Sequence, residues 1–249
     1  MRKPFQGVLN IVRFNWHLYL IALSLILCLL FITNYFDTPF QTIIYVFCIL
    51  IFAAFFVSLL ASFYVYDVSK IYNLEWIEKN NEEKTILNIN AGFDETSQLL
   101  HNKFDTAELL ALDFYNPIKH TEVSIKRARK AYPPFLNTKR IETTNLKFEN
   151  NSVDKIIVIF SAHEIRDKNE RLLFFKELYR IINPKGQIYV TEHLRDIPNF
   201  LVYNMGCFHF YSKTSWKKIF KEANLTIIKE IKLNPFVSNF ILDKNGNPL

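Results

Sequence analysis

The sequence TILNINAGFDETSQLL, residues 85–100, decides the fold of this chain. Its first five residues are mostly β-branched or apolar, which is typical of a short buried strand. The segment 90–92 breaks that strand, and 94–100 predict the start of a helix. Strand, tight turn and helix form the first unit of a nucleotide-binding α/β sheet, whose ligand lies over the turn at the carboxyl end of the strand.

Composition narrows the class of protein. The chain has 249 residues, half of them hydrophobic, and a net charge of +6 without a dense basic cluster, which argues against nucleic acid as a partner. Three cysteines are too few for a disulfide framework. No Cys-x-x-Cys and no His/Cys cluster has zinc-ligand spacing, so we expect no metal and a reducing compartment.

Two uncharged runs, 18–36 and 38–66, precede this unit. Both reach the ~20 apolar residues that a helix needs to cross a bilayer, and the breakers Asp37 and Pro39 separate them. A cleaved signal peptide would have one shorter apolar core. We therefore expect a transmembrane helical hairpin, and a pair of buried helices in a soluble protein is the alternative.

Charge predicts the orientation of this hairpin. Arg2, Lys3 and Arg13 precede the first run, whereas the turn carries only Asp37. The positive-inside rule then places the N-terminus in the cytoplasm, and two crossings return the rest of the chain there. Residues 67–84 mix charge with apolar residues at near-helical spacing, which predicts a short amphipathic connector helix. The expected domains are a hairpin (1–66), this connector (67–84) and an α/β domain (85–249).

A second strand, 107–114, carries Asp113 near its end, about twenty positions past the glycine turn. A carboxylate there can accept hydrogen bonds from both ribose hydroxyls of a nucleoside; the alternative is a turn residue that merely ends the strand. Pro117 predicts the start of a helix that runs to about 132, with a basic face that is solvated or meets anionic lipid headgroups.

Ionisable residues follow the next strands. A short strand near 140–141 precedes a buried strand at 155–160, which ends at His163 and Glu164. His163 could act as a general base, or it could pack beneath a loop. A helix capped by Asp167 leads to a strand at 186–194, which carries Glu192 and His193. His193 and His209 are second choices for the general base.

The segment IPNFLVYNMGCFHFYS, residues 197–212, is aromatic and nearly uncharged. It could cover an active site, dip into the membrane interface or form a helix buried in the domain. A helix at 213–223 and an antiparallel pair of strands at 225–233 and 236–243 close the chain, with Asn234-Pro235 as the turn.

Residues 85–243 resemble the class I S-adenosylmethionine-dependent methyltransferases, in particular the ubiquinone and menaquinone methyltransferases. LNINAGFD (87–94) stands where the family has a strand and a Gly-x-Gly-x-Gly turn, and FFKELYRIINPKGQIYVTE (174–192) matches its helix, Pro-x-Gly turn and fifth strand. The resemblance implies a Rossmann-like seven-stranded α/β sheet with helices on both faces, and S-adenosylmethionine as cofactor. The cofactor contacts it implies are Asn88, Asn90, Gly92, Asp94, Asp113, Glu142, Thr143 and Ser161. The catalytic candidates are His163, Glu164, Glu192 and His193.

The first motif departs from the family. Asn88 replaces its acidic residue, and Asn90 and Asp94 replace its first and third glycines. Asn tolerates a tight turn, and Asp is a good helix N-cap. We hypothesise that Asp94 takes over contact with the cofactor's ammonium group.

The expected function is a membrane-anchored methyltransferase acting on a lipid-like acceptor. The alternative is a methyltransferase fold that has lost cofactor binding and serves as a membrane-bound scaffold. A dehydrogenase is disfavoured because the glycine fingerprint is too depleted to pack a pyrophosphate.

Overall fold

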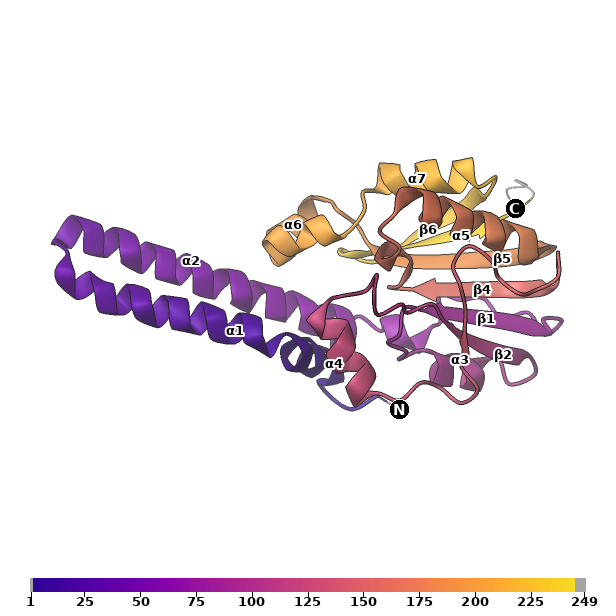
Figure 1. Ribbon diagram of the computed structural model, residues 1–249, viewed down its shortest axis with the longest axis horizontal. Helices are drawn as coiled ribbons and strands as arrows, with labels where there is room; N and C mark the ends of the chain where they lie inside the picture. Colours follow the sequence, from indigo (N-terminus) through magenta and orange to yellow (C-terminus); the bar gives the residue numbers. More distant parts are fainter. Residues whose placement is uncertain (1, 245–249) are drawn as a thin grey trace.

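The computed structural model describes residues 2–244 and shows an α/β domain from which a long helical hairpin projects (Figure 1). In this part of the chain seven strands form a sheet in the order β3-β2-β1-β4-β5-β7-β6. All neighbouring pairs from β3 to β5 are parallel, whereas β7 runs antiparallel to both β5 and β6. The strands are β1 (Thr85–Asn90), β2 (Glu108–Asp113), β3 (Lys139–Arg140), β4 (Val153–Ile159), β5 (Ile182–His193), β6 (Thr226–Asn234) and β7 (Val237–Asp243). The Rossmann-like seven-stranded sheet expected from the sequence is confirmed.

Helices cover both faces of this sheet because alternate strand residues point to opposite sides. Leu87 and Ile89 belong to the larger core cluster, which α5 (Lys168–Ile181) and α7 (Lys213–Glu222) complete. Ile86 faces the other way and packs with Leu100 of α3 (Ser97–Lys103) and with Phe104, which directly follows this helix. Both faces of β1 are therefore buried, and its carboxyl end alone is left to border a site.

The predicted amphipathic connector helix is wrong. A π-turn (Tyr64–Val68) and a 3₁₀ turn (Ile71–Asn73) are followed by irregular chain, because Lys70 and Leu74 adopt left-handed conformations with φ of 58° and 56°. Leu74 and Ile77 are nevertheless buried in the same cluster as Ile86. The apolar residues of the segment 67–84 therefore complete the core and do not form one face of a surface helix.

The hairpin consists of α1 (Gln6–Ile32) and α2 (Thr38–Phe63), which pack side by side (Figure 1). Asn15 has non-helical dihedrals and donates its side-chain amide to the Ile11 carbonyl, so α1 is kinked there. Residues 6–14 pack on the domain, and residues beyond the kink project away from it. Only 11% and 6% of the most apolar stretches of the two helices are buried. The alternative of two buried core helices is therefore not supported.

Other boundaries differ from the expected ones. α3 begins at Ser97 and not at residue 94, and α4 (Val123–Ala131) begins six residues after Pro117. The Asn116 side chain accepts the backbone N–H of Ile118 and folds that segment into a turn. β5 begins at Ile182 and not at 186.

The aromatic segment forms a lobe outside the sheet. It contains α6 (Ile197–Tyr203) and the 3₁₀ turn η5 (Asn204–His209), and we call residues 197–209 the aromatic lobe. Ile197 and Met205 are 75% and 74% exposed. A helix buried in the domain is therefore the wrong interpretation of this sequence, while a cover and an interface segment both remain compatible with the fold.

Candidate active site

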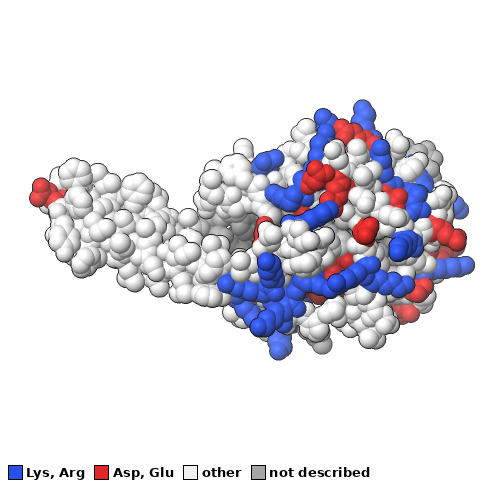
Figure 2. All heavy atoms as spheres, in the orientation of Figure 1, with Lys and Arg blue, Asp and Glu red and all other residues white. Residues whose placement is uncertain are grey.

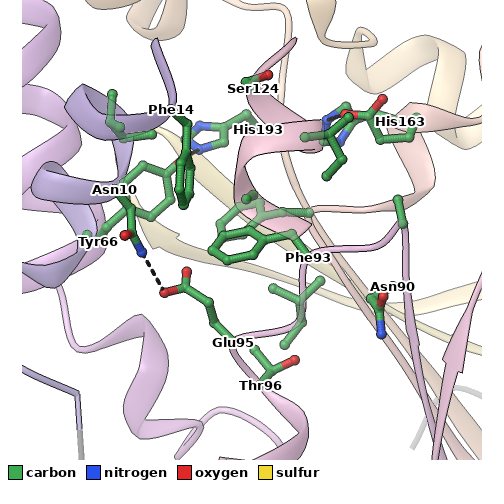
Figure 3. A pocket seen from close by; sticks show the side chains of 18 of the residues that line it. Asn10, Phe14, Tyr66, Asn90, Phe93, Glu95, Thr96, Ser124, His163 and His193 are labelled. Atoms are coloured by element: carbon green, nitrogen blue, oxygen red, sulfur yellow. Dashed lines mark hydrogen bonds and ion pairs between the residues drawn. The ribbon is translucent and has the colours of Figure 1, made fainter. Parts of the chain in front are cut away.

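A cavity of about 240 Å³ lies at the carboxyl ends of β1 and β4. Its floor is formed by the end of β1 and the following turn, including Asn88, Asn90 and Phe93. Asn10 and Phe14 of α1 form the opposite wall (Figure 3). The site is therefore shared between the α/β domain and the first three turns of the hairpin, which the sequence did not reveal.

Polar contacts hold this wall in place. Glu95, directly after the turn, accepts hydrogen bonds from the side chains of Gln6 and Asn10 at 3.2 Å and from the Tyr72 hydroxyl at 3.1 Å. Arg2 forms an ion pair with the same carboxylate at 2.9 Å. One partly buried acidic side chain thus holds the N-terminal segment against the turn.

The start of α1 has a second fastening point. The Asp67 carboxylate accepts the backbone N–H groups of Gly7 and Val8, both at 2.8 Å. These N–H groups have no partner within the helix, and a carboxylate is also favoured by the helix dipole at this end. A Cβ on Gly7 would lie 2.3 Å from Cβ of Tyr66, so this close approach requires glycine.

Side chains build the tight turn after β1. Gly92 has a φ of +96°, which glycine adopts without strain. The Asn90 side-chain oxygen Oδ1 accepts the Gly92 N–H at 2.9 Å, and Asp94 Oδ1 accepts the N–H groups of Thr96 and Ser97. Asn90 therefore supports the turn through its side chain, and Asp94 caps the approach to α3.

Two polar atoms of this turn have no partner in the described part of the chain. They are Asn90 Nδ2, a donor, and Asp94 Oδ2, an acceptor, and both are buried. A buried polar group without a partner costs roughly 1–3 kcal/mol. A ligand that carries both a carboxylate and an ammonium group would satisfy both atoms.

Asp113 does not line the cavity. Its Oδ2 forms an ion pair of 2.6 Å with Arg129 of α4, and its Oδ1 accepts the Tyr115 N–H at 2.8 Å. Arg129 also donates to the Gly92 carbonyl at 3.2 Å. The guanidinium group therefore covers the side of the turn at which a ribose-binding carboxylate was expected.

The other implied cofactor contacts lie outside the cavity. Glu142 is exposed, and Thr143 donates to Glu170 at 2.5 Å. The Ser161 hydroxyl donates to the Ile89 carbonyl at 2.8 Å and joins the ends of β4 and β1. Their assignment as cofactor contacts stays a prediction.

The strand-end histidine His163 is held by two acidic side chains. Its Nδ1 lies 2.6 Å from Oε2 of the fully buried Glu192, and its Nε2 lies 3.4 Å from Glu164. Burial lowers the pKa of His163, but the Glu192 charge and hydrogen bonds to both carboxylates outweigh it and raise the pKa to about 10. His163 is therefore cationic near neutral pH in the chain without ligands.

His193 has the opposite character. Burial lowers its pKa to about 4, so the ring is neutral. Asn199 uses its amide nitrogen to donate to Asp196 and Phe236, so its oxygen accepts a hydrogen bond from His193 Nδ1 at 3.1 Å. This arrangement leaves Nε2 as an acceptor for the Tyr66 hydroxyl at 2.9 Å.

Two aromatic rings stack on the His193 ring. The Phe160 ring stacks on His193 with centroids 5.1 Å apart, and Phe210 stacks on it at 4.9 Å. Phe160 has a φ of +50°, a strained conformation for an aromatic residue, and such strain clusters at functional sites.

Comparison with known proteins agrees with this geometry. Residues 87–190 match the family model described as "Methyltransferase domain". The match covers 104 of the 249 residues and supports the resemblance to the class I S-adenosylmethionine-dependent methyltransferases. The match runs from β1 to β5 and so contains the cavity floor, His163 and the Arg129–Asp113 pair. No curated protein sequence matches the chain.

Solved structures share the fold of this methyltransferase domain. An S-adenosylmethionine-dependent methyltransferase from Aquifex aeolicus has 16% identity and a TM-score of 0.51, over 70% of this chain and 88% of that one. The PH0226 protein from Pyrococcus horikoshii has the same identity and TM-score, over 70% and 86%. A Leishmania major S-adenosylmethionine-dependent methyltransferase has 14% identity and a TM-score of 0.50, over 73% of each chain.

The cofactor of the methyltransferase domain is S-adenosylmethionine, and the residues fit one end of it well. Its methionine part carries a carboxylate and an ammonium group, which match the free donor of Asn90 in the cavity lining and the free acceptor of Asp94, which lies in the same turn between the lining residues Phe93 and Glu95. Its ribose would need Asp113, whose carboxylate is engaged by Arg129. The nucleoside end therefore requires that Arg129 move.

Sequence reasoning found some residues of the methyltransferase site and missed others. Five of the twelve implied residues line the cavity, and they are Asn88, Asn90, His163, Glu164 and His193. Residues from α1 and Tyr66 were missed, since they belong to the apolar hairpin and its end, where no catalytic motif is expected. Arg129 was interpreted as part of a solvated or lipid-facing helix face.

Proposed function

We propose that this chain is a membrane-anchored methyltransferase that moves the methyl group of S-adenosylmethionine to a lipid-like acceptor. The observation that carries the proposal is the wall of the cavity. Gly7, Asn10, Ile11 and Phe14 of α1 line it, and the same helix continues beyond Asn15 as an exposed apolar rod. One wall of the cavity and the first helix of the proposed anchor therefore belong to the same helix, α1.

The hairpin has the dimensions of a bilayer anchor. The 17 residues of α1 beyond the kink and the 26 of α2 extend roughly 25 Å and 39 Å, against a hydrocarbon core of ~30 Å. Figure 2 shows no charge along this rod except at its tip, whose acidic residue is Asp37. Lys and Arg gather where the rod meets the domain, which supports a cytoplasmic domain and N-terminus.

Contacts between α4 and the base of the hairpin indicate where the bilayer surface would lie. Arg127 donates to the Phe14 carbonyl at 2.7 Å and its guanidinium lies 4.9 Å from the Trp16 ring centroid. Trp and Arg favour the interface between headgroups and acyl chains. The bilayer surface would therefore cross α1 close to its kink, near the mouth of the cavity.

The aromatic lobe suggests the path of the acceptor. Its helix α6 packs against α2 of the hairpin (Figure 1). The side chains of Phe200, Leu201 and Phe208 in the lobe are exposed. Exposed apolar side chains next to an anchor favour contact with lipid. Asn199 of the lobe binds His193, so this surface is connected directly to the cavity.

Tyr66 and His193 supply the proton chemistry in this proposal. Methyl transfer from a sulfonium to a hydroxyl releases one proton. The Tyr66 oxygen would accept it while the phenol proton passes to Nε2 of the neutral His193, to which it is already hydrogen-bonded. The remainder of the site orients the reactants and excludes water.

A scaffold without cofactor binding is the second candidate function. The observation that favours it is the Arg129–Asp113 ion pair, which occupies the carboxylate expected at the ribose. Under this candidate the pair is a permanent part of the core. Under the methyltransferase proposal it opens when the nucleoside binds.

Replacing Arg129 separates these candidates. We expect Arg129→Ala to strengthen S-adenosylmethionine binding by about fivefold, since a partly exposed ion pair contributes ~1 kcal/mol that the ribose no longer has to displace. Equilibrium dialysis with labelled cofactor measures this, and Lys130→Ala on the same helix is the control. Weaker binding by Arg129→Ala would show that the guanidinium instead holds Asp113 in position.

Replacing Asp94 tests the methionine end. Asp94→Asn keeps an oxygen to cap α3 but removes the charge opposite the cofactor's ammonium group, so we expect about tenfold weaker cofactor binding with an unchanged melting temperature. Asp105→Asn, at an exposed ion pair, is the matched control. Unchanged affinity in Asp94→Asn would eliminate this contact.

The acceptor can be sought without knowing its identity. Membranes from a deletion strain, restored with either the parent chain or His193→Ala, are incubated with S-adenosylmethionine labelled in its methyl group. The proposal expects label in the organic-solvent extract only with the parent chain. Label that stays in the aqueous or protein fraction would contradict a lipid-like acceptor.

A further inference from the structure

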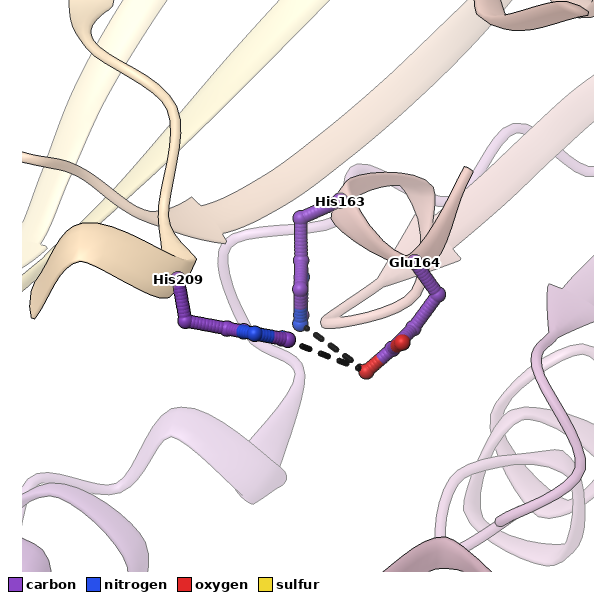
Figure 4. Close-up of side chains that lie close together, drawn as sticks. All are labelled: His163, Glu164 and His209. Carbon is purple, nitrogen blue, oxygen red and sulfur yellow. Dashed lines mark ion pairs between the residues drawn. The ribbon is translucent and has the colours of Figure 1, made fainter. Parts of the chain in front are cut away.

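The turns η4 (Ala162–Glu164) and η5 bring three side chains of metal-ligand type together (Figure 4). His163 Nε2 and His209 Nε2 lie 3.4 Å and 3.5 Å from the same oxygen, Glu164 Oε1. Ligand atoms of the three residues lie within 4.8 Å of one another. Ligands at 2.0–2.1 Å around a tetrahedral zinc ion are ~3.3 Å apart, so both spacings from a histidine to Glu164 already match a coordination sphere.

The second nitrogen of each histidine provides an independent observation. His163 Nδ1 lies 2.6 Å from Glu192 Oε2, and His209 Nδ1 lies 3.3 Å from Glu122 Oε1. Histidines that bind metals usually donate this other N–H to a carboxylate, which fixes the ring and makes Nε2 a better ligand. Both rings are therefore oriented with Nε2 toward the common centre.

We propose that His163, Glu164 and His209 bind one divalent transition-metal ion, for which zinc is the best match. Two imidazoles and one carboxylate form a set that leaves a position open for water or substrate. His163 and Glu164 also line the cavity, so the open position faces it. Resting on the proposed function, the ion would bind the acceptor oxygen and make its hydroxyl easier to deprotonate.

Spacing along the sequence concealed this site. His163 and Glu164 are adjacent in the sequence, but His209 belongs to the aromatic lobe, which follows α5 and β5 along the chain. The expectation that the chain binds no metal rested on the lack of a short ligand motif. A site assembled from two distant turns has no such motif.

The test uses the full chain in detergent, stripped with a chelator and dialysed against zinc, manganese or cobalt. We expect the parent to retain about one zinc ion per chain by mass spectrometry of the metal, and His209→Ala and Glu164→Ala to retain at least tenfold less. Glu192→Gln should weaken zinc binding by about 10–100-fold because it disturbs the orientation of His163. His101→Ala, at an exposed histidine elsewhere, should behave as the parent.

Two outcomes would overturn the inference. One is a parent chain that retains no zinc, manganese or cobalt above a blank without protein; the other is a His209→Ala variant, folded by circular dichroism, that retains as much metal as the parent. Cofactor binding is measured on the same samples. His209 does not line the cavity, so His209→Ala should bind S-adenosylmethionine normally. A variant that loses the metal but still binds the cofactor tests the metal site alone. A parent chain that does not bind the cofactor would instead contradict the proposed function.

Discussion

Replacing His193 by alanine is expected to reduce methyl transfer by about 10²–10⁴-fold, the range typical of losing a positioned acid–base group. The ring is neutral, lies in the cavity wall and accepts the hydrogen bond of Tyr66, so it is the group prepared to receive the acceptor's proton. Labelled methyl incorporation into membrane extracts measures the effect. Cofactor affinity should change less than threefold, because no cofactor contact is lost.

Tyr66→Phe distinguishes a proton relay from a packing role. Phenylalanine keeps the ring contacts with Phe160 but removes the hydroxyl that joins the acceptor to His193. We expect the rate to fall to nearly the level of His193→Ala, and the double variant to be no slower than either alone. Full activity in Tyr66→Phe would show that the hydroxyl takes no part.

Removing the partner of a buried lysine should have the largest effect on stability. Lys155 lies in the middle of β4 and is 2% exposed; it forms an ion pair of 2.7 Å with Glu83 and donates to the Glu78 carbonyl. Glu83→Ala leaves this charge without its acidic partner, which typically costs about 3–5 kcal/mol. The melting temperature should fall by roughly 6–20 °C at 2–4 °C per kcal/mol.

Glu82→Ala is the matched control for that experiment, since Glu82 is exposed and adjacent in sequence. It should melt within about 2 °C of the parent, as surface substitutions usually do. A Glu83→Ala variant as stable as this control would show that water reaches Lys155. The connector, residues 67–84, would then contribute little to the stability of the domain core.

Local patterns predicted the sheet because each strand is specified by its own residues. The run at 85–89 and the Asp167 cap, which accepts the Glu170 N–H, need no distant partner to be recognised. The turn Asn234-Pro235 is equally local, with Asn234 accepting the N–H groups of Phe236 and Val237. Such signals place strands and helices in the right order.

The parts that sequence did not predict depend on long-range contacts. Glu95 looks like an ordinary helix-start residue until Asn10 and Arg2 are found against it. Asp113 has the spacing of a ribose ligand, but a cation sixteen residues later occupies it. The kink at Asn15 divides one apolar helix between an exposed apolar rod and a cavity wall, and hydropathy alone cannot mark that division.

The central claim is that the cavity between β1, β4 and α1 holds S-adenosylmethionine. Calorimetric titration of the full chain in detergent, including residues 2–14, tests this most directly, because a fragment that starts at residue 67 would lack one wall. We expect micromolar binding that falls at least tenfold in Gly92→Val, where a side chain would meet Arg129 and Tyr115. A folded parent chain that gives no binding heat and no retention of labelled cofactor would contradict the account.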